Sequence, residues 1–192
     1  MKQNRNWTIL LIGGPSGTGK SRLASELSCI YEANVLELDD LVQAIQAVTT
    51  SDMLPALNYW SNGLDWKTVG VTGNVEWLIQ ASEEIRPALT AIIEHHLETD
   101  IPLIIEGDFL DPRFVTTIIT PKIRTMYLYE GDKDQIIRNY RDREGGEMQE
   151  YRAAISVAYG CWIAVQCREF GISMLDSRPW NSVIERAIKL LY

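Results

Sequence analysis

A glycine-rich run near the start of the chain limits the folds that this sequence can adopt. Residues 14–21 read GPSGTGKS and match the pattern G-x-x-x-x-G-K-[ST] at every fixed position. The preceding residues 7–13 (WTILLIG) are apolar without alternation, as in a strand buried on both faces of a parallel sheet. Residues 21–31 have the apolar spacing of a helix. A buried strand, a glycine-rich turn and a helix in this order predict an α/β fold.

The chemistry of this motif indicates a site for a phosphate chain. Glycines allow the turn to aim successive backbone N–H groups at one anion, and the N-terminus of the following helix favours negative charge. The side chain of Lys20 is expected to reach the β- and γ-phosphates, and the Ser21 hydroxyl is expected to contact Mg²⁺. We therefore predict that ATP binds with Mg²⁺ against Gly14, Ser16, Gly17, Thr18, Gly19, Lys20 and Ser21.

The remainder of the chain alternates between strand and helix patterns. Further strands are expected at residues 34–38, 101–106, 122–129 and 172–175, and helices at 41–48, 74–99 with a break or kink at Pro87, 132–143, 148–170 and 183–190. This alternation predicts one three-layer α/β/α domain over residues 1–192, with a five-stranded parallel sheet and right-handed crossovers. Residues 49–72 lack the pattern and contain Pro55, Gly63 and Gly70, so we expect a substrate-side insertion with short helical pieces.

Acidic residues follow two of the predicted strands, at the edge of the sheet where ligands bind in open α/β folds. Glu106 ends the third strand and is expected to hold Mg²⁺. Asp39 ends the second strand and is placed to accept a proton from a substrate hydroxyl. Asp40 has an alternative role as a helix cap. Asp108 is either a substrate residue or the cap of the segment that starts at Phe109.

Basic residues cluster before a glycine pair in this acidic chain. Arg138, Arg141 and Arg143 precede Gly145 and Gly146, so residues 138–147 form a candidate lid that closes over the γ-phosphate. We assign nucleotide binding to Arg138 and a catalytic role to Arg141, and the alternative is a solvated helix face. Arg178 follows the last strand, where the adenine often lies in this kind of nucleotide fold.

Three residues of the insertion are candidates for contact with the second substrate. Trp60, Asp65 and Trp66 lie in the irregular segment and can line an acceptor pocket. Of these we assign Trp66 to substrate binding. The alternative is that the aromatic rings pack a small subdomain.

Composition excludes several other classes of protein. A formal net charge of −8 argues against non-specific nucleic-acid binding, which needs a basic face. No apolar run approaches the ~20 residues of a membrane span, and the N-terminus lacks the pattern of a signal peptide. Cys29, Cys161 and Cys167 have neither disulfide nor metal spacing, which favours reduced thiols in a cytoplasmic protein.

Three stretches resemble a known family. IGGPSGTGKSRLA, IIEGDFLDP and GISMLDSRPW are similar to the 2-phosphoglycerate kinase family and to related small P-loop kinases of the nucleoside, shikimate and gluconate kinase-like group. The resemblance implies a sheet of order 2-3-1-4-5 and the use of ATP with Mg²⁺. It also implies that Lys20 and Ser21 are nucleotide residues, that Asp39 is the strand-end acid and that Glu106 is the Walker B-like acid.

Two departures from the family leave the second substrate open. Phe109 stands where the family usually has histidine, and residues 41–43 (LVQ) stand where an arginine is usual. The leading hypothesis is an enzyme that phosphorylates an alcohol group of a small molecule, with a 2-phosphoglycerate-like acceptor as one candidate. The alternatives are a nucleotide hydrolase, a nucleotide-gated regulatory protein without an acceptor, and a toxin-like sugar-nucleotide kinase. Both a monomer and a homodimer remain open.

Overall fold

The computed structural model describes residues 4–63 and 65–192. The strands are β1 (Ile9–Gly13), β2 (Asn34–Glu37), β3 (Leu103–Gly107), β4 (Ile123–Tyr129) and β5 (Met174–Asp176). The α-helices are α1 (Lys20–Tyr31), α2 (Leu38–Gln46), α3 (Gly70–Glu84), α4 (Arg86–Thr99), α5 (Pro112–Val115), α6 (Lys133–Glu144), α7 (Glu150–Phe170) and α8 (Val183–Leu190). Short 3₁₀ helices lie at Tyr59–Asn62, Thr116–Ile118 and Trp180–Ser182.

The five strands form one parallel sheet in the order β2-β3-β1-β4-β5. This order and the three-layer architecture confirm the predicted fold class. All residues of β1 and β3 are buried, as the apolar runs in the sequence predict, whereas β2 lies at an edge and is mostly exposed. Because all strands run the same way, their carboxyl ends meet at one edge, and the turn after β1 lies there.

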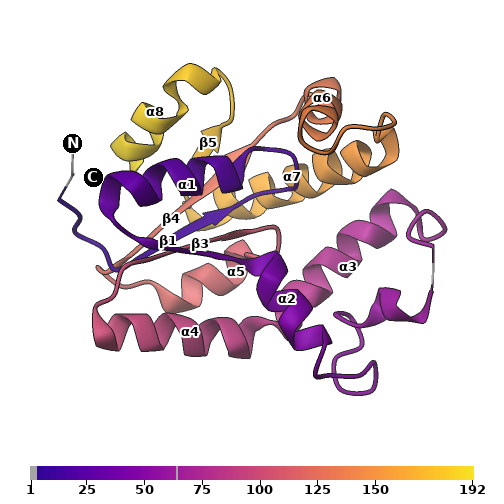
Figure 1. The fold of residues 1–192 in the computed structure, drawn as a ribbon, viewed down its shortest axis with the longest axis horizontal. Helices are drawn as coiled ribbons and strands as arrows, with labels where there is room; N and C mark the ends of the chain where they lie inside the picture. The colour runs from indigo at the N-terminus through magenta and orange to yellow at the C-terminus, as the bar shows by residue number, and fades with distance from the viewer. Residues whose placement is uncertain (1–3, 64) are drawn as a thin grey trace.

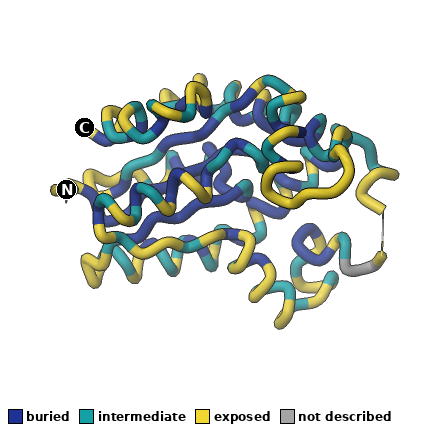
Figure 2. Tube along the Cα trace, turned by 45° about the horizontal axis from the view of Figure 1, so that its top comes forward, coloured by how far each residue is buried: buried dark blue, intermediate teal, exposed yellow. Residues whose placement is uncertain are grey.

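Successive residues of β1 point to opposite faces of the sheet and belong to two separate cores. Leu10 and Ile12 pack with α1 and α8, whereas Ile9 and Leu11 pack with α4, α5 and α7. Figure 1 shows α1 and α8 on one side of the sheet and α4 and α5 on the other. Figure 2 shows buried backbone running through the central strands, with alternating exposure along the outer helices.

The second strand ends earlier than the sequence predicted. Helix α2 begins at Leu38, whose buried side chain packs into the core, so Asp39 and Asp40 lie in the first turn of α2 and do not end β2. The cap position belongs to Glu37, and it forms no side-chain capping bond. The predicted capping role of Asp40 is therefore wrong.

The predicted helix at residues 74–99 is two helices, as the proline allowed. The break falls at Ile85, and Pro87 occupies the first turn of α4. The N–H groups of a first turn have no partner within the helix, so proline removes no helical hydrogen bond there. Helix α5 was not predicted. Its cap is Asp111, whose Oδ1 accepts a hydrogen bond of 2.8 Å from the N–H of Arg113, so Asp108 does not cap this segment.

The irregular segment at residues 49–72 lies against α3. Glu84 accepts hydrogen bonds from the backbone N–H groups of Ala56 and Leu57 at 3.0 and 2.8 Å, and Trp77 Nε1 donates to the Ala56 carbonyl at 2.8 Å. These bonds fix the segment beside the carboxyl edge of the sheet (Figure 1). Its role as a substrate-side insertion stays a prediction, and Leu64 lies outside the described residues. Among the helices described, none is both long and apolar enough to cross a membrane.

Candidate active site

The turn between β1 and α1 depends on glycine at several positions, two of which lie where α6 and the segment after β5 approach it. Gly17 and Gly19 have φ angles of 83° and 92°, in the left-handed region that favours glycine. A Cβ atom at Gly19 would lie 2.6 Å from the ring of Trp180, and one at Gly17 would lie 2.9 Å from Ile136. Asn139 Nδ2 also donates to the Gly17 carbonyl at 2.8 Å, which ties α6 to the turn. The loop is thus clamped between α6 and the segment after β5.

Lys20, the lysine of the glycine-rich loop at residues 14–21 (the P-loop), pairs with an acidic residue. Lys20 is buried, and its Nζ donates to Asp108 Oδ1 at 2.6 Å and to the Pro15 carbonyl at 3.1 Å. Burial lowers the pKa of Lys20, but the charges of Asp108 and Glu106 outweigh it, so the pKa is raised overall. Lys20 therefore carries its positive charge at the end of the loop, where the motif predicted it.

Glu106 and Ser21 both line a small cleft of about 30 Å³, which exceeds the roughly 10–15 Å³ that one water needs. Burial raises the pKa of Glu106, whereas the charge of Lys20 and a hydrogen bond from Ser21 lower it, and the net effect is a raised pKa. The two oxygen ligands suit Mg²⁺, which usually takes one or two carboxylates and completes its coordination with phosphate oxygens and water. Within the described residues no three His, Cys, Asp or Glu side chains gather into a metal cage. The donor set fits an ion that arrives with a nucleotide.

Asp39 lies where this cleft meets a larger cavity, since it lines both. Desolvation raises the pKa of Asp39, the charge of Asp108 adds to this effect, and the charge of Lys20 opposes it. A carboxylate with a raised pKa is a stronger base than an ordinary aspartate. The residue that the sequence identified as a base is therefore beside the P-loop, on a helix rather than at the end of a strand.

The larger cavity, called here the aromatic cavity, has a volume of about 340 Å³. It is lined by Pro15 and Ser16 of the P-loop and by Asp39 and Asp108, which also line the small cleft. Six aromatic residues line the rest of it, Trp60, Trp66, Trp77, Phe109, Tyr140 and Tyr159, together with Asn74, Leu78, Arg152, Ile155 and Ser156. Trp60 and Trp66 thus lie where the sequence placed an acceptor pocket, and Asp65 does not line this cavity.

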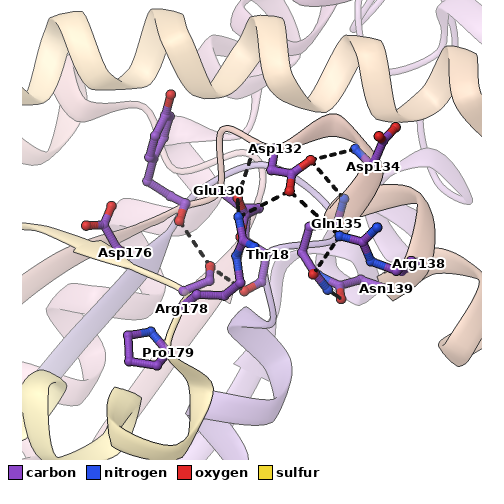
Figure 3. A network of polar contacts seen from close by, with 12 residues as sticks. Thr18, Glu130, Asp132, Asp134, Gln135, Arg138, Asn139, Asp176, Arg178 and Pro179 are labelled. Atoms are coloured by element: carbon purple, nitrogen blue, oxygen red, sulfur yellow. Dashed lines mark hydrogen bonds and ion pairs between the residues drawn. The ribbon is translucent and has the colours of Figure 1, made fainter.

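A second cavity, called here the polar cavity, has a volume of about 550 Å³ and lies on the other side of the P-loop, against Gly17, Thr18 and Gly19. Arg178 and Trp180 line it, and both carry a planar group, a guanidinium and an indole ring. Figure 3 shows Arg178 between Glu130 and Asp132. Its Nε and Nη2 donate to the Glu130 carboxylate at 2.6 and 2.9 Å. This two-point bond fixes the guanidinium plane.

The arginines of the candidate lid point in different directions. Arg143 lines both the polar cavity and the small cleft, and its charge acts on Asp39. Arg138 instead donates to Gln135 Oε1 at 3.0 Å and lies 3.7 Å from Asp132, and it lines none of the cavities described above (Figure 3). Arg141 is exposed and lines none of them either. The geometry therefore favours Arg143 over the two arginines that the sequence singled out, whose roles stay predictions.

Sequence reasoning missed Arg152 and Trp180. Arg152 Nη2 donates to Ser16 Oγ at 3.3 Å, and its guanidinium lies 4.2 Å from the ring centroid of Tyr140. Arg152 follows the glycine pair in α7, and only the packing of α7 against α6 brings it to the P-loop. Trp180 closes the GISMLDSRPW stretch, and its packing on Gly19 could have been suspected from that position.

Known proteins resemble this chain in sequence and in fold. No protein-family model matches the sequence. The 2-phosphoglycerate kinase of Pyrococcus horikoshii is 32% identical over 112 residues, which are 56% of this chain and 37% of that protein. That of Methanocaldococcus jannaschii is 30% identical over 116 residues, 58% of this chain and 37% of that protein. The chain is distantly homologous to 2-phosphoglycerate kinases. It spans little more than a third of the length of these homologues.

Solved structures agree on the fold. A gluconokinase from Sinorhizobium meliloti superposes with a TM-score of 0.57 at 14% identity and covers 98% of this chain and 93% of its own. A shikimate kinase from Acinetobacter baumannii in complex with shikimate superposes with a TM-score of 0.55 at 14% identity, with 97% and 92% coverage. At this identity the likeness establishes a shared fold, that of small P-loop kinases, and confirms the resemblance seen in the sequence.

Proposed function

We propose that this protein transfers the γ-phosphoryl group of ATP to a hydroxyl group of a small molecule. The observation that carries this proposal is that two cavities share the P-loop. Gly17, Thr18 and Gly19 line the polar cavity, whereas Pro15 and Ser16 line the aromatic cavity. A hydrolase needs room for a nucleotide and a water molecule. A transferase needs a second cavity at the γ-phosphate end, and the aromatic cavity beside Pro15 and Ser16 would supply it.

The nucleotide would lie with its base in the polar cavity, against Arg178 and Trp180, and its phosphates along the loop. Lys20 would leave Asp108 and bind the β- and γ-phosphates, because a phosphate chain offers it more negative charge than one carboxylate. Ser21 and Glu106 would hold Mg²⁺, which supplies charge neutralisation on the phosphate oxygens. Arg143 would bind the γ-phosphate from α6.

Asp39 would act on the acceptor. A hydroxyl group in the aromatic cavity would donate its proton to the Asp39 carboxylate as the hydroxyl oxygen attacks phosphorus. The new O–P bond forms while the bond between the γ-phosphorus and the bridging oxygen breaks, and ADP leaves. Residues 138–147 would serve as the lid. The homology to proteins named 2-phosphoglycerate kinase supports phosphoryl transfer, and the departures at Phe109 and residues 41–43 keep their acceptor from being assigned here.

The test combines one variant with a requirement for acceptor. We expect Lys20→Ala to reduce kcat by roughly 10²–10³-fold, as loss of one electrostatic contact to the transition state does elsewhere. Lys189→Ala, which alters an exposed lysine paired with Glu185 at 2.8 Å, should leave the rate unchanged. ATP turnover should also depend on an added acceptor. Equal turnover with and without acceptor would instead identify a hydrolase or a nucleotide-gated regulator.

A further inference from the structure

The aromatic cavity has a composition that limits the chemistry of the acceptor. At about 340 Å³ it falls at the low end of the ~300–1,000 Å³ range of small-molecule sites. Three of its rings form a row of edge contacts. The Trp60 and Trp77 centroids lie 5.4 Å apart, and those of Trp77 and Phe109 lie 5.9 Å apart. Rigid rings in contact present flat apolar surfaces to whatever enters.

Several polar groups of this wall already have partners within the protein. Asn74 Nδ2 donates to the Trp66 and Gly70 carbonyls at 2.7 and 2.8 Å. The Tyr159 hydroxyl donates to the Asp108 carbonyl at 2.8 Å. The Tyr140 hydroxyl is bonded to Ser156 Oγ at 2.7 Å. A ligand therefore meets mainly ring surfaces and bonded polar groups along the wall, and the Asp39 carboxylate offers it a hydrogen-bond acceptor.

The charges of the cavity disfavour an acidic ligand. Among the described lining residues there are two carboxylates, Asp39 and Asp108, and one cation, Arg152. Arg152 Nη1 already donates to both oxygens of Glu144 at 2.9 Å. Lys20 pairs with Asp108 at 2.6 Å, and the charges of Lys20 and Arg143 act on Asp39, but neither cation lines the cavity. An acceptor with phosphate and carboxylate groups would therefore find one lining cation, Arg152, which is already paired.

Three further cations near this region do not line the cavity. Arg86 and Arg113 both pair with the buried Asp111, at 2.8 and 2.6 Å. Lys67 is exposed, lies 5.8 Å from the Trp66 ring centroid and is not among the residues that line the cavity. None of these three supplies the cavity with a second positive charge.

We propose that the acceptor is an uncharged alcohol on a flat, largely apolar ring system, bound between the aromatic rings with its hydroxyl group at Asp39. This inference rests on the proposed kinase activity and gives the class of its substrate. It also gives the aromatic residues of the 49–72 segment a function. Trp66 is exposed by 36%, more than burial in a subdomain core would leave it.

The test separates acceptors by charge and polarity. A metabolite extract of the source organism is divided by ion exchange into anionic, cationic and uncharged fractions, and the uncharged fraction is divided again by retention on a reversed-phase column. Each fraction is incubated with the full chain, Mg²⁺ and ATP radiolabelled in the γ-phosphoryl group. We expect labelled product from the uncharged, retained fraction. Asp39→Asn protein should label this fraction at least ~100-fold more slowly.

Other results contradict the inference in distinguishable ways. Label from the anionic, cationic or uncharged but unretained fraction would overturn the assigned class and leave the kinase activity standing. No label from any fraction would contradict the kinase activity itself, and the inference would fail with it.

A pair of variants then tests the location of the acceptor. Trp66→Ala should raise the KM for the labelled acceptor roughly three- to tenfold, with the KM for ATP unchanged. Phe170→Ala removes an aromatic side chain of similar exposure, 39%, at the far end of α7 and should change neither constant. An unchanged acceptor KM in the Trp66→Ala protein would place the acceptor outside this cavity.

Discussion

Asp39 and Asp40 are neighbours in the first turn of α2, but they differ in whether they line the candidate site. Asp39 lines the aromatic cavity and the small cleft beside Lys20, and Asp40 lines neither. If Asp39 takes the proton of the acceptor, Asp39→Asn should lower kcat by ~10²–10⁴-fold, because asparagine keeps the size but cannot accept a proton. The KM for ATP should change little, since the lost interaction forms mainly in the transition state.

Asp40→Asn is the matched control for this prediction. It is one residue away on the same turn and, like Asp39, is exposed, but it lines neither the cavity nor the cleft, so both the rate and the melting temperature should stay near those of the unaltered protein. Steady-state kinetics of both variants with a working acceptor make the comparison. A rate loss in Asp40→Asn alone would move the base by one position, and a loss in neither would remove the proposed base from α2.

The pH profile gives an independent measure of the same carboxylate. The pKa of Asp39 is raised, first by desolvation and then by the charge of Asp108. The ionised form is the active one, so kcat/KM should fall as pH decreases through a midpoint above the ordinary aspartate value of about 3.9. Burial also raises the pKa of Glu106, so a second acid step should remain in Asp39→Asn protein assayed at high enzyme concentration. A midpoint at or below the ordinary value would contradict this prediction.

At the level of secondary structure, α6 carries three arginines on different faces. Only Arg143 of the three lines the cleft and the polar cavity, whereas Arg141 is exposed and Arg138 pairs within its own helix. Arg143→Ala should therefore lower kcat by ~10-fold or more, a loss of about 1.4 kcal/mol in transition-state stabilisation. Arg141→Ala is the matched control from the same helix and should have little effect. The reverse pattern would mean that α6 rotates when nucleotide binds.

Some residues of the candidate site could be located from the sequence, and others could not. The glycine-rich motif and the apolar strands fix the sheet, so Lys20, Ser21 and Glu106 could be placed from local sequence alone. Arg152 could not, because its position beside Ser16 depends on how α7 packs on α6, and a helical pattern does not specify a crossing. The start of α2 was also missed, because Leu38 continues the apolar pattern of β2 while its burial comes from tertiary packing.

At the scale of the whole molecule, both cavities lie against the P-loop, at the carboxyl edge of the sheet. The P-loop lies between the cavities, and α6 and the segment after β5 hold it there through Asn139 and Trp180. A nucleotide that fills the polar cavity therefore contacts elements from the beginning, middle and end of the chain. Ligand binding should for this reason stabilise the fold as a unit rather than one element of it.

Thermal unfolding measures this coupling. A ligand that binds only the native state stabilises it by about 2.7 kcal/mol at a concentration of 100 times its Kd. For a domain of this size, each kcal/mol shifts the Tm by roughly 2–4 °C, so saturating MgATP should raise the Tm by roughly 5–10 °C. Chelation of Mg²⁺ should remove most of this shift if Ser21 and Glu106 act through the ion.

Glu106→Gln should lose the Mg²⁺-dependent part of the Tm shift and keep the part that ATP supplies alone, because the P-loop is unchanged. A shift that persists in full with excess chelator would separate these two side chains from the metal, while the absence of any shift with MgATP would contradict nucleotide binding by the P-loop.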